Sequence, residues 1–148
     1  MPRRKITKDE PCPVARSLDV VGDRWSWLIV RDAFDGVRRF GDLQRSLGVA
    51  RNILSDRLHK LVDAGVLETQ AASDGTAYQE YVLTAKGESL FPVVVAMRQW
   101  GERHLFERGE RHSMLVDRRT NRPVPPMVPA AKDGTVLTSA STEVKKVV

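Results

Sequence analysis

The order of amphipathic segments in the first half of the chain constrains its fold more than any other sequence feature. Apolar residues recur at helical spacing over residues 24–34, over the short segment 40–47, and again over about 50–64. Gly48 closes the short segment, so the next one follows after a tight connection. Two alternating runs within residues 66–83 surround an Asp-Gly turn and predict a β-hairpin.

This element order is that of a winged helix-turn-helix, an α+β fold: a helix, a short helix, a tight connection, a second helix and a hairpin. In that motif the short helix supports the next one, whose first turns enter the major groove of DNA. The side of helix 50–64 opposite its apolar stripe carries Asn52, Ser55, Asp56, His59 and Asp63, with Arg51 and Lys60 at its edges. Such groups can pair with base edges or phosphates, so this side is a candidate reading face. Arg57 lies near the apolar border, where a structural ion pair is expected.

Two observations weaken this interpretation of the helix. Any amphipathic surface helix is polar on one side, and Asp56 and Asp63 would repel phosphates. The residues that flank the helix pair favour DNA binding, because Arg38 and Arg39 precede the short helix and can contact phosphates. The expected wing, residues 72–77, contains no Lys or Arg, so its phosphate contacts fall to Ser73, Thr76 or backbone amides. The net charge of +5 adds only an unfocused hint of a polyanionic partner.

A long amphipathic helix is expected after the hairpin, over about residues 85–106, with Thr84 as its N-cap. Pro92 should kink this helix or delay its regular part. This helix and the first helix, about 14–21, both carry apolar side chains that must be shielded from water. They are Val14, Leu18, Leu90, Phe91, Val94, Met97 and Trp100. A two-fold dimer would cover them and present two reading helices to half-sites about 34 Å apart. The alternative is that they complete a monomeric core.

The chain divides by composition into three predicted parts. Residues 1–10 form a basic tail, 11–106 the winged domain, and 107–148 a small β-rich arm with a loose end. Strand-like pieces in the arm are 114–116, 124 and 127–128. Prolines at 123, 125, 126 and 129 should keep such strands at sheet edges or outside a sheet.

Six ordered motifs resemble those of a known family. They are Cys12-Pro13-Val14, residues 19–25 with 28–32, residues 39–43, residues 53–58 with Leu61 and Gly65, residues 83–87, and Trp100-Gly101. Together they resemble the HxlR group of bacterial winged-helix regulators, relatives of the MarR type, over about residues 11–106. The resemblance implies a homodimeric, sequence-specific transcriptional regulator whose dimer contacts come from the first and last helices of the domain.

The single cysteine, Cys12, precedes Pro13 at the start of a predicted helix, with Arg16 one turn further on. Helix N-termini and nearby cations both favour the reactive thiolate. In the resembled family a cysteine at this place serves some members as a sensor of disulfide stress, quinones or related electrophiles. A resolving thiol would have to be Cys12 of the other subunit or a small thiol. The alternative is a helix-capping residue that never reacts.

Other function classes find little support in the sequence. The three histidines, His59, His104 and His112, form no standard zinc motif, and no Gly-rich phosphate loop follows a strand. We therefore expect no metal, no cofactor and no enzymatic activity. No signal-peptide core and no run of about 18 apolar residues is present, which predicts a cytoplasmic protein without membrane contact.

The sequence thus predicts a homodimeric transcriptional regulator, a repressor, that binds operator DNA and responds to an oxidant, an electrophile or a small ligand. The rival hypothesis is a winged-helix module that binds proteins and has no specific affinity for DNA. Salt dependence and competitor DNA distinguish the two, because specific binding survives competition and still weakens steeply with salt.

Overall fold

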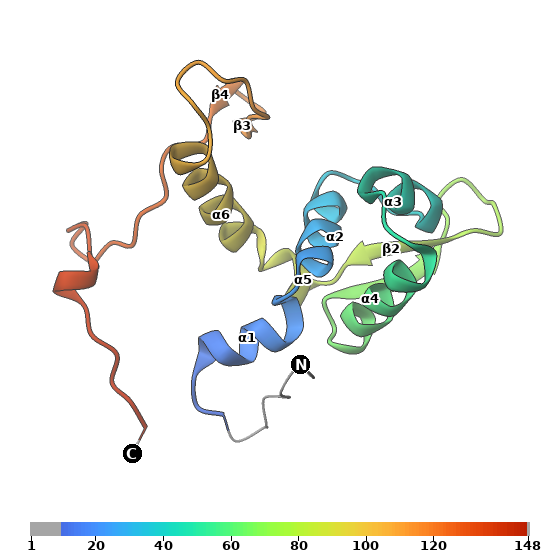
Figure 1. Cartoon of the computed structure of the whole chain (residues 1–148), viewed down its shortest axis with the longest axis horizontal. Coiled ribbons are helices and arrows are strands. Elements are labelled where there is room, and N and C mark those ends of the chain that lie inside the picture. The colour runs from blue at the N-terminus through green and yellow to red at the C-terminus, as the bar shows by residue number, and fades with distance from the viewer. Residues whose placement is uncertain (1–9, 148) are drawn as a thin grey trace. The chain divides into compact units, whose positions relative to one another are not determined.

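The structure, a computed structural model, describes residues 10–147 and divides the chain into two compact units, Met1–Phe91 and Pro92–Val148 (Figure 1). Most of the predicted basic tail (1–10) and the last residue of the arm lie outside the described residues. The predicted boundary between residues 106 and 107 remains a prediction. Among residues 10–147, no helix is long and apolar enough to cross a membrane.

The first unit contains the predicted helices and hairpin in the predicted order. Its elements are α1 (Pro13–Val21), α2 (Arg24–Phe34), α3 (Phe40–Leu47), α4 (Arg51–Asp63), β1 (Leu67–Ala71), β2 (Gln79–Leu83) and α5 (Ala85–Glu88). Strands β1 and β2 pair antiparallel, with Leu67 opposite Leu83 and Ala71 opposite Gln79. Helix α2 packs against α3, α4 and β2, and β1 packs against α4. Figure 1 shows this arrangement, and the α+β class is confirmed.

Local signals in the sequence set the ends of these helices. Asp23 caps α2, because its Oδ2 accepts a hydrogen bond from the Ser26 amide at 3.0 Å. Gly48 ends α3 in the left-handed conformation, with φ of 63°, and its amide donates to the Gln44 carbonyl at 2.9 Å. That turn buries Val49 and lets α4 begin at Arg51. The tight connection of the helix-turn-helix therefore depends on one glycine.

One apolar core holds α4 in place. The side chains that are almost fully buried come from α2, α3, α4 and the start of the hairpin: Ile29, Val30, Leu43, Leu54, Leu58, Leu61, Val66 and Leu67. Leu54, Leu58 and Leu61 all lie on one side of α4. The opposite side of α4 is therefore fixed in direction by this packing.

An ion pair adds to this packing. Arg57 Nε on α4 lies 3.0 Å from Asp23 Oδ2, the same oxygen that caps α2. Partial burial by itself raises the pKa of Asp23, but hydrogen bonds from Ser26 and Arg57 outweigh it and hold the pKa below its ordinary value. This pair confirms the structural role expected for Arg57 and ties the reading-helix candidate to the start of α2.

Arg57→Met should lower the free energy of unfolding by about 1 kcal/mol at neutral pH, since it removes a charged hydrogen bond to a half-buried carboxylate. Because the pKa of Asp23 is lower in the folded chain than in the unfolded one, this contribution is complete above about pH 4 and declines as the pH falls through the folded pKa. Urea unfolding at several pH values checks this. The exposed Arg45, paired with Asp42, gives the control: Arg45→Met should change stability by less than about 0.5 kcal/mol at any pH. An equal effect of both substitutions would contradict the role of Arg57.

The helix expected over about residues 85–106 is divided into two helices next to Pro92, where a kink or a delayed start was predicted. Helix α5 ends at Glu88, and α6 (Phe91–His104) begins after a two-residue turn. Pro92 explains the break, because it has no amide hydrogen to donate to the Glu88 carbonyl and its ring clashes with a continuing helix. Thr84 does cap α5, since its Oγ1 accepts from the Gly87 amide at 3.0 Å.

The second unit contains less β-structure than expected for the arm. Strands β3 (Val116–Asp117) and β4 (Arg122–Pro123) have only two residues each, and a single bridge joins Ala130 and Val136. A short 3-10 helix, η1 (Ser139–Ser141), follows. Residues 127–128 lie outside any strand, one of the two outcomes predicted from the flanking prolines, which provide no amide donors.

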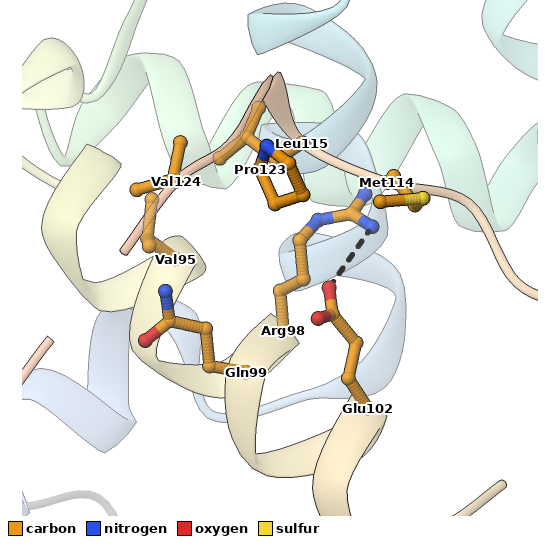
Figure 2. A pocket seen from close by; sticks show the side chains of 8 residues that line it. All are labelled: Val95, Arg98, Gln99, Glu102, Met114, Leu115, Pro123 and Val124. Carbon is orange, nitrogen blue, oxygen red and sulfur yellow. Dashed lines mark ion pairs between the residues drawn. The ribbon is translucent and has the colours of Figure 1, made fainter. Parts of the chain in front are cut away.

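Side chains of α6 replace the missing strand pairing and hold the arm. Gln99 Nε2 donates to the Pro125 carbonyl at 3.0 Å, and Gln99 Oε1 accepts from the Met127 amide at 2.8 Å. Figure 2 shows Arg98, Gln99 and Glu102 on α6 beside the arm residues Met114, Leu115, Pro123 and Val124. The cavity between them measures about 30 Å³, which is about the volume of one water molecule. This cavity is therefore too small for an organic ligand, and the hydrogen bonds of Gln99 anchor the arm to α6.

Candidate nucleic-acid interface

The predicted reading residues lie together on the exposed side of α4. Arg51, Asn52, Ser55, His59 and Lys60 are all exposed, whereas the apolar side of the helix is buried. The guanidinium of Arg51 lies 5.1 Å from the centre of the Phe40 ring on α3. The first turns of α4 thus present an amide, a hydroxyl and an oriented guanidinium to solvent.

The two acidic residues of this side, which weaken the DNA interpretation, are each paired on α4. Asp56 Oδ2 lies 3.2 Å from Lys60 Nζ and 2.5 Å from Arg57 Nη1. The hydrogen bond from Lys60, with a further one from Arg57, lowers the pKa of Asp56. Asp63 Oδ2 lies 3.3 Å from His59 Nε2. Repulsion of phosphates is therefore weaker than the bare charges suggest, while Lys60 and His59 are partly engaged within the helix.

An ion pair that no sequence pattern indicates joins the wing to the start of α3. Arg39, at the cap of α3, pairs with Asp74 at the tip of the hairpin and lies 5.1 Å from the centre of the Tyr78 ring. Hydrogen bonds from the backbone and side chain of Thr76, and then the bond from Arg39, lower the pKa of Asp74 to about 2. The pair joins the start of α3 to the wing, so Arg39 is less available to DNA than predicted.

The backbone amides of the wing are also occupied. The Ser73 amide donates to Glu80 Oε1 at 3.0 Å, and the Thr76 amide donates to Asp74 Oδ1 at 3.0 Å. Glu80 lies on β2 and is buried, and the hydrogen bond from the Ser73 amide compensates its carboxylate for the lost solvent. The hydroxyls of Ser73 and Thr76 lie on exposed residues. We therefore still predict weak contacts between the wing hydroxyls and DNA phosphates. Phosphate contacts through the amides of Ser73 and Thr76 do not fit the structure, because both amides already donate to carboxylates.

Arg38, two residues before α3, is a further candidate for a phosphate contact. It is exposed, and its carbonyl accepts a hydrogen bond from the Tyr81 amide at 2.8 Å. The backbone at Arg38 is thereby fixed to β2 while the side chain faces solvent. This geometry suits the predicted phosphate contact beside α4.

The predicted dimer residues are mostly exposed. Val14 and Leu18 on α1, and Phe91, Met97 and Trp100 on α6, face solvent in the single chain, and Leu90 and Val94 are half-buried. The Phe91 ring also lies 5.4 Å from that of Phe34. These apolar side chains are those that a partner would cover.

Cys12 is exposed and occupies the N-cap position of α1. Its amide donates to Glu10 Oε1 at 3.2 Å, and Arg16 Nε donates to the Glu10 carbonyl at 2.5 Å. A solvent-facing thiol is therefore present where the sequence predicts the sensor. Among residues 10–147, no three His, Cys, Asp or Glu side chains lie close enough together to hold a metal ion.

A model of the HxlR-like helix-turn-helix family matches residues 20–109. The chain belongs to this family. The HxlR-like domain therefore includes α2, α3, α4, the hairpin and the helices that follow it. The resemblance drawn from the six motifs is confirmed.

Similar proteins extend this assignment. The uncharacterized HTH-type transcriptional regulator Rv3095 of Mycobacterium tuberculosis is 47% identical over 92 residues, which are 62% of this chain and 58% of the relative. The chain thus spans less than two thirds of that relative's length. The crystal structure of PA1607, described as a candidate transcription factor, is 51% identical with a TM-score of 0.89 and covers 95% of this chain and 98% of its own. The redox regulator HypR in its reduced form is 29% identical, with a TM-score of 0.58 over 64% of this chain and 94% of its own.

Proposed function

We propose that this HxlR-like protein is a sequence-specific DNA-binding transcriptional regulator, a homodimeric repressor of the cytoplasm and not an enzyme. The observation that carries the proposal is the first half of α4, where Arg51, Asn52 and Ser55 are exposed on a helix fixed by its buried leucines and by Arg57. The family and the transcriptional-regulator names of its relatives support the same conclusion.

The geometry supports a specific division of labour on DNA. Asn52 can pair with the edge of an adenine and Arg51 with a guanine or a phosphate, while Arg38 contacts the backbone beside them. Ser73 and Thr76 add weak wing contacts through their hydroxyls. In a two-fold dimer, two copies of α4 would read half-sites about 34 Å apart.

Selection from genomic DNA fragments with the purified full chain tests this proposal. A regulator enriches a small set of fragments with two-fold symmetric sequence, and its binding survives competitor DNA while weakening steeply between low and physiological salt. A protein-binding module would enrich no sequence and would be displaced by competitor. That result would contradict the proposal.

We infer further that Cys12 makes the regulator responsive to oxidants. The exposed thiol at the α1 N-cap supports this, as does the similarity to the redox regulator HypR. In the proposed step, diamide takes two electrons and two protons from two thiols, and a disulfide forms. The two sulfurs belong to the Cys12 residues of both subunits, or one belongs to a small thiol such as glutathione.

Cys12→Ser should bind the selected operator as the native protein does and should lose the response to diamide, because serine has no thiol to oxidise. Fluorescence anisotropy with labelled operator, before and after diamide and after added dithiothreitol, measures both properties. Non-reducing electrophoresis follows the disulfide in parallel. An unchanged diamide response in Cys12→Ser would rule out this cysteine as the sensor.

A further inference from the structure

A second surface feature lies in the first unit, away from the reading face of α4. It is a pocket of about 270 Å³ lined by residues of α1, of the segment before β1, and of α5 with the turn after it. Its lining residues are Arg16, Ser17, Val20, Val21, Val66, Lys86, Ser89 and Leu90. Leu90 alone is shared with the predicted dimer residues, so the pocket is a distinct feature.

The lining has the composition of a site for an amphipathic anion. Val20, Val21, Val66 and Leu90 provide the apolar part, and Arg16 and Lys86 provide two positive charges. No lining residue is acidic. The two serine hydroxyls donate to backbone carbonyls, from Ser17 to Pro13 at 2.8 Å and from Ser89 to Lys86 at 2.5 Å. The polar donors suited to a ligand are therefore cationic.

Lys86 is well placed to accept such a ligand. Its Nζ donates to the Ala64 carbonyl at 2.7 Å, and within the described part of the chain no carboxylate lies within 4.0 Å of it. An ammonium group has three protons, so two remain for a further acceptor. A ligand carboxylate would thus supply the counter-charge that the described residues do not.

The volume limits the size of the ligand. A water molecule takes about 30 Å³, so the pocket has the volume of about nine water molecules. A one- or two-ring aromatic acid has this size, with a flat apolar body and one charged end. Longer acyl chains or nucleotides are too large.

We propose that this pocket binds a small aromatic carboxylate, with its ring on the valines and Leu90 and its carboxylate on Lys86. The site is connected to the reading helix through Lys86, because Ala64 is the C-cap of α4. Thr84 Oγ1, two residues earlier, donates to the Gly65 carbonyl at 2.5 Å. A bound carboxylate shares Lys86 with the Ala64 carbonyl, so ligand binding is coupled to the position of the α4 C-terminus.

This regulatory consequence depends on the proposed DNA binding, whereas the binding of the ligand does not. The test therefore uses the full chain without DNA. Isothermal titration calorimetry with 1-naphthoate should give saturable binding of one molecule per chain. The uncharged 1-naphthalenemethanol should bind more weakly.

Two variants separate the charge from the cavity. Lys86→Met should weaken 1-naphthoate binding by about tenfold or more, because a charged hydrogen bond is lost. It should leave 1-naphthalenemethanol unaffected. Val20→Trp should prevent binding of both compounds by filling the cavity. Lys132→Met, on an exposed residue of the arm, is the matched control and should bind like the native chain.

Circular dichroism establishes that each variant is folded. The proposal is contradicted if 1-naphthoate shows no saturable binding at millimolar concentration, or if Lys86→Met binds it as tightly as the native chain does. Undiminished binding by Val20→Trp would place the ligand elsewhere and would also overturn it. None of these outcomes bears on operator selection, so the two proposals fail independently.

Discussion

Gly87→Ala should lower the free energy of unfolding by about 3 kcal/mol or more, a large part of the stability of an ordinary domain. A Cβ at this position would lie 2.2 Å from the Val66 carbonyl oxygen and 2.9 Å from Leu83 Cδ2. The oxygen cannot move away easily, because it belongs to a buried backbone segment and accepts a hydrogen bond from the Thr84 amide at 3.1 Å. Relief of the clash would also break the cap at the start of α5.

Gly41→Ala is the matched control. Gly41 lies inside α3, and its added Cβ would meet only the end of the flexible Arg45 side chain, at 3.6 Å. Alanine has the higher helix propensity, so this variant should be as stable as the native chain or slightly more stable. Urea unfolding followed by circular dichroism measures both variants. If Gly87→Ala unfolds at the same urea concentration as Gly41→Ala, the close approach of α5 to Val66 is not as described.

The double substitution Met97→Glu with Trp100→Glu should convert the protein to a monomer and remove nearly all operator affinity. Both side chains lie on one side of α6 and are 52% and 58% exposed in the single chain. Substitution at a central interface residue costs roughly 2 kcal/mol or more, so the pair should weaken association by about three orders of magnitude. A monomer reads one half-site only, and its affinity for the full operator falls accordingly.

Sedimentation velocity measures the oligomeric state, and fluorescence anisotropy measures operator binding. Val144→Glu changes an exposed apolar residue of the arm, 80% exposed, and should leave both properties unchanged. Circular dichroism should show the same helix content in all three proteins. A double variant that remains dimeric and binds operator normally would contradict the predicted dimer surface.

The sequence predicted the helix-turn-helix and the hairpin well, because local signals determine them. Asp23 and Gly48 mark helix ends through their own side chain or backbone, and the buried leucines of α4 repeat at helical spacing. The role of Arg57 also followed from its place on the helix wheel. The helix ends and the leucine stripe depend on neighbours within a few residues, whereas Asp23, the partner of Arg57, lies 34 positions away.

Features that depend on distant neighbours were not visible in the sequence. The Arg39–Asp74 pair joins residues 35 positions apart, and the inward turn of Glu80 depends on the Ser73 amide. In the arm, Gln99 holds residues 125 and 127 through side-chain hydrogen bonds that no periodicity indicates. The break before Pro92 could have been predicted more firmly, since the proline itself signals it.

The affinity of Asn52→Ala and of His59→Ala for the selected operator shows whether α4 reads the bases. Asn52 lies in the first turn of α4, and loss of a base contact there should cost about 1–3 kcal/mol and relax sequence preference at one position of each half-site. His59, partly engaged by Asp63, should show a smaller loss. Asp19→Ala, on the exposed side of α1, is the control and should bind normally. If both α4 variants bind the operator with native affinity and native sequence preference, α4 is not the reading helix and the account is wrong.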